Sequence, residues 1–124
     1  MSTIKVVNLQ QKLSLFKDQW SPKIVAELND SHVKVVKVQG EFVWHKHDNE
    51  DEMFLVINGE LKIELRDGVL DIKPGELVVI PRGVEHRPVA ASEVSIVLIE
   101  PKGTVNTGTA TDTGDKKSTE GEWI

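Results

Sequence analysis

Residues 52–65, EMFLVINGELKIEL, carry the clearest folding signal in this chain. Asn58-Gly59 separates two apolar runs, and a two-residue hairpin turn of this type needs positive φ at both positions, which Asn and Gly tolerate best. The second run, LKIEL (61–65), alternates apolar and polar residues as a strand with one buried face does. The stretch therefore predicts a β-hairpin.

The same pattern of short apolar runs and turns continues on both sides of this hairpin. Further turns are indicated at Asp67-Gly68, Pro74-Gly75 and Pro81-Arg82-Gly83, where the glycines and prolines have structural roles. The predicted strands around the hairpin cover residues 23–29, 32–40, 41–47, 69–72, 76–80, 84–91 and 93–99. Many short strands with regular turns predict an all-β sandwich or barrel.

The two ends of the chain differ from this central region. Residues 8–20, NLQQKLSLFKDQW, have apolar residues at helical spacing after a possible N-cap, Asn8, and predict a helix over about 9–20. From Gly103 the composition becomes polar, so we expect a barrel domain over 1–102, with its strands at about 23–99, and a polar tail over 103–124. The final Trp123-Ile124 leaves two alternatives for the tail, docking on the barrel or a neighbouring subunit, or simple disorder.

Composition limits the classes of function. The chain has 124 residues, 39% of them hydrophobic, which fits one domain with a real core. Its net charge of −5 argues against a nucleic-acid partner. It has no cysteine for a disulfide, a thiolate metal site or a thiol nucleophile. Neither a signal-peptide pattern nor an apolar run of membrane-spanning length is present, so a cytoplasmic protein is expected.

Histidines and one carboxylate form the candidate metal site. His45 and His47 are two residues apart in a strand-like segment, which places both imidazoles on one face. Glu52 begins the next strand, and His86 follows the turn at 81–83. Spacing alone leaves two interpretations open, a metal site or a solvent-facing polar pair, whereas His32 has no partner motif and is expected to be structural.

Other charged residues are weaker candidates. The acidic stretch 48–51 suggests calcium, although such loops are usually just solvated. Lys46, Arg82 and Arg87 lie near the histidines in sequence and could meet an anionic substrate, but surface charge is the simpler interpretation.

Two segments resemble the two sequence motifs of the cupin superfamily. The first runs from Gly40 through His45-Lys46-His47 and Glu52 to Gly59, and the second from Gly75 through Pro81-Arg82-Gly83 to His86. The resemblance covers roughly residues 32–99 and is closest to small single-domain cupins described as mannose-6-phosphate isomerase-like. It implies a double-stranded β-helix, or jelly-roll barrel, that binds one divalent metal through His45, His47, Glu52 and His86. Two departures are a first motif one residue shorter than usual before His45, and Ala90 where the second motif usually ends in Asn.

The resemblance leaves three functions open. The first is a metal-dependent dioxygenase or related oxidoreductase acting on a small substrate that chelates through two oxygen atoms. The second is a sugar or sugar-phosphate isomerase or epimerase, and the third is a barrel that binds a small ligand or keeps a metal for stability only. Iron, manganese, nickel and zinc all suit the ligand set. A homodimer is expected from the resemblance together with the apolar outward faces of 53–57 and 94–99.

Overall fold

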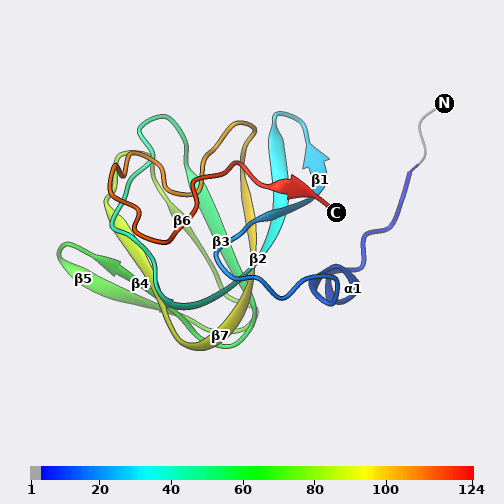
Figure 1. The fold of residues 1–124 in the computed structure, drawn as a ribbon, viewed down its shortest axis with the longest axis horizontal. Helices are drawn as coiled ribbons and strands as arrows, with labels where there is room; N and C mark the ends of the chain where they lie inside the picture. The colour runs from blue at the N-terminus through cyan, green and yellow to red at the C-terminus, as the bar shows by residue number, and fades with distance from the viewer. Residues whose placement is uncertain (1–3) are drawn as a thin grey trace.

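The computed structural model describes residues 4–124, so the first three residues of the expected domain 1–102 lie outside the described residues. Within this range one short helix precedes eight strands (Figure 1). The elements are α1 (Leu9–Leu13), β1 (Lys23–Leu28), β2 (Ser31–Glu41), β3 (Glu52–Asn58), β4 (Leu61–Leu65), β5 (Gly68–Ile72), β6 (Leu77–Ile80), β7 (His86–Pro101) and β8 (Glu122–Trp123).

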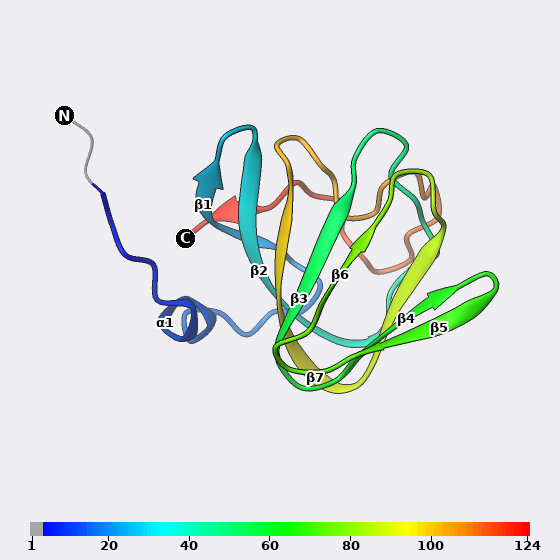
Figure 2. The ribbon, with the colours of Figure 1, turned by 180° about the vertical axis from the view of Figure 1, so that it is seen from behind.

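Strand β7 holds the sheet together because it pairs with three other strands. Residues 86–89 of β7 pair with β4, residues 89–90 and 94–101 pair with β2, and residues 95–99 pair with β3. The strand order is β5-β4-β7-β2-β1-β8, and β3 pairs with β7 and with β6. The hairpin predicted over 52–65 is therefore wrong in its pairing, because β3 and β4 each pair with β7 and not with one another across Asn58-Gly59. The sheet rolls around a common interior, seen from behind in Figure 2, which confirms the predicted all-β jelly roll with a short N-terminal helix.

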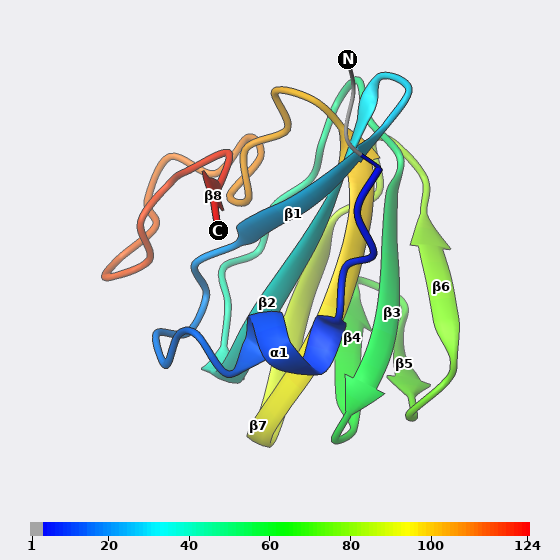
Figure 3. The same cartoon turned by 90° about the vertical axis from the view of Figure 1, so that its right-hand side faces the viewer.

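The barrel interior and the outer face of the sheet are both apolar. Inward-facing residues form the main core, whose members include Val36, Val38, Phe54, Val56, Leu61, Ile63, Ile96 and Leu98. A second cluster on the outer face joins Val35 and Val97 to Leu13 and Phe16 from the N-terminal segment. In Figure 3 α1 lies across this outer face. The non-alternating run 53–57 is thus covered on both sides, inside by the core and outside in part by this segment.

The predicted helix over 9–20 is wrong in its length. Only 9–13 is helical, and Ser14 ends it, with its hydroxyl donating to the Gln11 carbonyl at 2.6 Å. Ser side chains compete for backbone hydrogen bonds in this way and favour helix ends. Phe16 still reaches the outer-face cluster, but from a non-helical backbone.

Two predicted strand boundaries are also wrong. The segment 41–47 was expected to be a strand, but β2 ends at Glu41 and the chain then leaves the sheet, keeping one isolated bridge between His45 and His86. Phe42 and His45, three residues apart, are both buried, which strand alternation does not allow. In contrast, the strands expected at 84–91 and 93–99 are one strand, β7.

The polar tail is docked on the barrel. In Figure 1 it crosses the near side of the molecule, orange to red, from the end of β7 back to β1. There β8 pairs with β1 in parallel, the Lys12 ammonium donates to the Ile124 carbonyl at 2.9 Å, and Thr104 and Thr107 are buried. Of the two alternatives for Trp123-Ile124, docking on the barrel is confirmed. No helix within residues 4–124 is long and apolar enough to cross a membrane.

Candidate metal centre

The four residues expected to bind metal come together inside the barrel. His45 lies in the irregular segment after β2, His47 follows it, Glu52 begins β3 and His86 begins β7. All four are buried, and one potential ligand atom from each lies within 4.8 Å of the others. The structure therefore assembles a three-histidine, one-carboxylate group from two segments that are far apart in the sequence.

Backbone carbonyls fix the orientation of two of the imidazoles. His45 Nδ1 lies 2.9 Å from the Val43 carbonyl, and His86 Nδ1 lies 2.9 Å from the Val84 carbonyl. A carbonyl oxygen can only accept, so each Nδ1 carries the proton and each Nε2 has a free lone pair directed at the group. The backbones of His45 and His86 also bond to each other in both directions, at 3.1 and 2.9 Å.

The donor set fits a divalent metal. Ligand atoms about 2.1 Å from one ion lie roughly 3–4 Å apart, close to the spacing of these four side chains. Nε2 of His86 and of His47 lie 3.3 and 3.4 Å from the same Glu52 oxygen. Even so, His47 Nε2 is buried and has no hydrogen-bond partner among residues 4–124. A buried ring nitrogen without a partner is costly, and a metal ion would satisfy it.

Burial and neighbouring groups set the charge of the cluster. Burial, together with repulsion from His86, lowers the pKa of His45 to about 4, so this ring is neutral and able to bind metal at neutral pH. Burial alone would raise the pKa of Glu52, but the close approach of the His47 and His86 rings to its carboxyl group outweighs burial and lowers that pKa. The carboxylate is therefore ionised, as a metal ligand has to be.

A buried ion pair behind Glu52 was not anticipated from the sequence. Lys34 Nζ lies 2.9 Å from Glu100 Oε1, and the two side chains are each 1% exposed. The register of Met53 with Ile99 places Glu52 directly opposite Glu100 on β7. Burial and the Glu52 charge raise the pKa of Glu100, while Lys34 opposes that rise. The hint in the sequence was Lys34, a lysine at an inward position of a valine-rich strand.

The other charged candidates are engaged away from the cluster. Arg82 bonds to Asp51, Arg87 to Glu64 and Glu41, and Lys46 to Asp48. Two carboxylates of the acidic stretch 48–51, those of Asp48 and Asp51, are therefore paired with these cations. His32 is buried beside Glu27, at 3.7 Å, and against the Trp123 ring, which agrees with the structural role expected for it.

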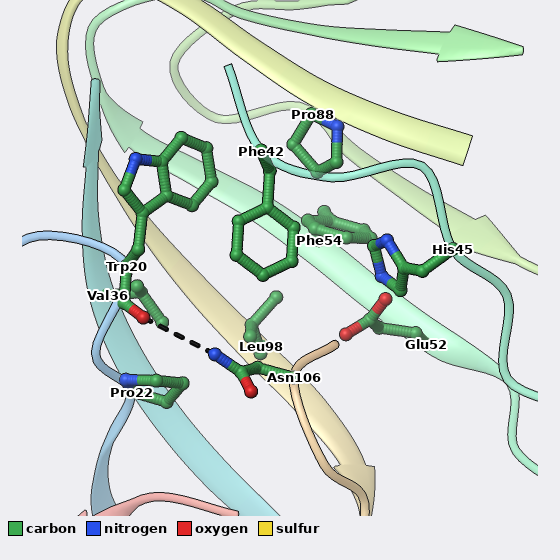
Figure 4. Close-up of a pocket in the computed structure, with 10 residues that line it drawn as sticks. All are labelled: Trp20, Pro22, Val36, Phe42, His45, Glu52, Phe54, Pro88, Leu98 and Asn106. Carbon is green, nitrogen blue, oxygen red and sulfur yellow. Dashed lines mark hydrogen bonds between the residues drawn. The ribbon is translucent and has the colours of Figure 1, made fainter. Parts of the chain in front are cut away.

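A small cavity of about 40 Å³ adjoins the cluster and is lined mainly by apolar and aromatic side chains (Figure 4). His45 and Glu52 lie at one end and Trp20 at the other. The cavity gives the cluster a place beside it for a small molecule. Ala90, which departs from the usual second motif, is buried in the main core.

Comparison with known proteins gives a consistent result. The cupin domain model, Cupin_2, matches residues 32–100. The uncharacterized protein YdbB of Bacillus subtilis (strain 168) is 33% identical over 84 residues, which is 67% of this chain and 74% of that protein.

Two solved structures are also similar. A cupin-2 domain containing protein from Shewanella frigidimarina NCIMB 400 shares 51% identity with a TM-score of 0.77, over 77% of this chain and 94% of that one. Protein NMB1881 from Neisseria meningitidis shares 33% identity with a TM-score of 0.72, over 78% and 99%.

Proposed function

Since this chain belongs to the cupin domain family, we propose that it is a metal-dependent enzyme that binds one divalent ion through His45, His47, Glu52 and His86. The observation that carries the proposal is the convergence of these four buried side chains, with the Nε2 of His47 left without a hydrogen-bond partner in the described part of the chain. Of the metals considered, iron, manganese, nickel and zinc remain candidates, because imidazole binds all of them. Small-molecule binding is the general role that the cupin domain suggests.

Within this class we favour a dioxygenase or related oxidoreductase acting on a small substrate that chelates through oxygen. A divalent metal held here would supply Lewis-acid chemistry, or redox chemistry if it is iron. The protein would hold the imidazoles of His45 and His86 in their ligating tautomer and keep bulk water from the cluster. No lysine or arginine lines the adjoining cavity in the described part of the chain, which argues against a sugar phosphate and so against the isomerase alternative.

Metal content tests this proposal directly. The chain is purified without metal chromatography and compared with His47→Ala and with His32→Ala, which removes an equally buried imidazole outside the cluster. We expect about one metal per chain in the wild type and in His32→Ala, and none in His47→Ala. Bound iron would lead to O2-uptake assays with diols and enols, and zinc or manganese to sugar-phosphate assays.

A wild-type chain without metal, and with no gain in thermal stability on adding each candidate ion, would refute the metalloenzyme and leave a ligand-binding barrel. A stoichiometric metal without turnover would favour the third alternative, a metal kept for stability only.

We also propose a homodimer, based on the outer face of the sheet. Strand register places Ile99, Met53 and Val79 in one row and Val97, Leu55 and Leu77 in the next. Leu77 and Val79 are 57% and 50% exposed, beyond the reach of the N-terminal cluster. Light scattering of wild type and of Val79→Asp would test this, with a shift from dimer to monomer expected in the variant. The cytoplasmic location stays a prediction.

A further inference from the structure

Trp20 closes the cavity at the end opposite the candidate metal ligands (Figure 4). Its indole stacks on Phe42 at 4.8 Å between ring centroids, and Phe42 in turn contacts the His45 ring at 5.3 Å, edge to face. An aromatic path therefore links this wall to the cluster. Trp20 and His45 mark the two ends of the cavity, so the position of the Trp20 ring limits how long a bound molecule can be.

The backbone of Trp20 is strained, and several bonds hold it in place. Its φ is 59°, a left-handed conformation that bulky residues rarely adopt. The Trp20 backbone N–H donates to the Lys37 carbonyl at 2.8 Å, and the indole Nε1–H donates to the Gln39 carbonyl at 2.8 Å. Strain that the surrounding structure maintains is typical of ligand-contacting positions.

Asn106, from the docked tail, completes the wall without adding a free polar group. Its Nδ2 donates to the Trp20 carbonyl at 3.4 Å and to the Lys117 carbonyl at 3.0 Å, while its Oδ1 accepts from the Thr119 N–H at 2.9 Å. Both amide hydrogens and the oxygen are therefore used within the chain. The polar atoms left to a ligand are those of the candidate metal cluster at the other end.

Trp20 and Asn106, which form this wall, both lie outside the part of the chain that matches the family model. The cupin model covers residues 32–100, whereas Trp20 precedes it and Asn106 follows it. The cavity of about 40 Å³ has room for roughly three water-sized groups. Trp20 and Asn106 therefore close the cavity from segments that flank the residues matched by the family model.

We propose that Trp20 is the specificity-determining residue of this site, and that it restricts the substrate to a small molecule with a short apolar part and oxygen donors. The apolar part lies against Trp20 and Phe42, and the oxygen atoms reach the end formed by His45 and Glu52. The inference rests on the proposed metal-dependent function and adds a substrate class to it.

Cobalt(II) serves as a spectroscopic metal for the test, and two hydroxamates that chelate through the same two oxygens serve as probes. Acetohydroxamic acid carries a methyl group and benzohydroxamic acid a phenyl ring. Affinities are read from changes in the visible cobalt bands, after the cobalt content of each protein has been measured. The wild type is expected to bind the methyl probe more tightly than the phenyl probe, by about tenfold or more.

Trp20→Gly removes the indole and suits the left-handed backbone. It is expected to bind the phenyl probe about tenfold or more tightly than the wild type does, with its cobalt content unchanged. Trp20→Phe keeps a smaller ring against Phe42, and its affinity for the phenyl probe is expected to lie between those of the wild type and Trp20→Gly. Trp44→Ala is the matched control, because Trp44 stacks on Arg66 at 3.8 Å and does not line the cavity.

The outcomes separate the two proposals. A wild-type chain that takes up no cobalt overturns the metal-dependent function and this inference with it. Cobalt bound normally, with the preference between probes within about twofold of wild type in Trp20→Gly and Trp20→Phe, overturns the role of Trp20 alone. An equal change in Trp44→Ala overturns it as well.

Discussion

Replacing Lys34 by Met tests how much the buried ion pair behind the metal cluster contributes to stability. The change removes the cation 2.9 Å from Glu100 and its second bond, to the Thr104 carbonyl at 3.2 Å, but keeps a side chain of similar length. Because both side chains of the pair are 1% exposed, the Glu100 carboxyl stays buried without a partner. Loss of one member of a buried pair costs about 3–5 kcal/mol. We expect the lower part of that range, because Glu100 can take up a proton.

The loss should depend on pH with a definite sign. Burial and the Glu52 charge raise the pKa of Glu100 above its usual 4.5, and Lys34 acts against that rise. The folded chain therefore keeps a proton that the unfolded chain releases above pH 4.5, and this group makes stability fall as pH increases. Without Lys34 the pKa rises further. The deficit of Lys34→Met should be smallest below pH 4.5 and grow as the pH rises.

Urea unfolding of metal-free protein, followed by tryptophan fluorescence at several pH values, measures this. The control is Lys62→Met, which breaks a shorter ion pair with Asp71, 2.7 Å, whose side chains are 55% and 50% exposed. That variant should lose less than about 1 kcal/mol. The double variant Lys34→Met with Glu100→Met should regain most of the loss, because an apolar pair can replace a buried ion pair. Equal losses in the two lysine variants, or no recovery in the double variant, would refute the reasoning.

Three further predictions concern the cluster and the tail. Adding the native metal at about 100 times its Kd should stabilise the wild type by about 2.7 kcal/mol in a thermal scan, and His47→Ala should show no gain. The pKa of His45 is lowered to about 4, so the folded metal-free chain binds fewer protons than the unfolded one and its stability should fall as pH drops from 6.5 to 4. The free energy of unfolding of His45→Phe should lack this pH-dependent part, which amounts to at most about 3 kcal/mol. The same pH profile in His45→Phe and the wild type would contradict this role of His45. Gly108→Ala should loosen the tail and speed its limited proteolysis, because a Cβ there would collide with the Lys46 carbonyl. Gly40→Ala is the control: Gly40 also has a positive φ, 83° against 52° for Gly108, but has open space around it, so this change should leave the tail protected.

Local signals in the sequence located most of the turns, but the pairing predicted across Asn58-Gly59 is wrong, since β3 and β4 both pair with β7. The four cluster residues were predicted from the resemblance to the cupin motifs, because spacing alone left the metal site open. Gly59, Gly75 and Gly83 have positive φ, as glycines in tight turns commonly do, but Asn58 does not, so the turn at 58–59 lacks the conformation predicted for a two-residue hairpin. The spacing of His45 and His47 predicted that the two imidazoles would lie together, and their ring centroids are 5.1 Å apart. They do so from an irregular segment rather than the expected strand, so the prediction succeeded on a backbone of a different kind.

Features that depend on distant parts of the chain could not be predicted in this way. Lys34 and Glu100 are 66 residues apart and meet only through the pairing of β2 with β7. The composition of the tail indicated a loop or disorder, yet Thr104 and Asn106 are buried: the Thr104 carbonyl accepts from the Lys34 ammonium, and the Asn106 amide donates to the Trp20 carbonyl. Polar residues do order a segment when each finds a partner, but those partners are visible only in the fold.

The threefold pairing of β7 has a consequence for how the chain acquires its structure. A growing chain that ends before residue 86 can form the local hairpins β1–β2 and β4–β5, but β2, β3 and β4 still lack the strand that joins them. The edges of these strands stay unpaired until residues 86–101 have been synthesised. Closure of the barrel therefore depends on contacts of long sequence separation. Folding is therefore expected to be slow, with a final step in which β7 assembles the barrel and the His86 side of the metal cluster at the same moment.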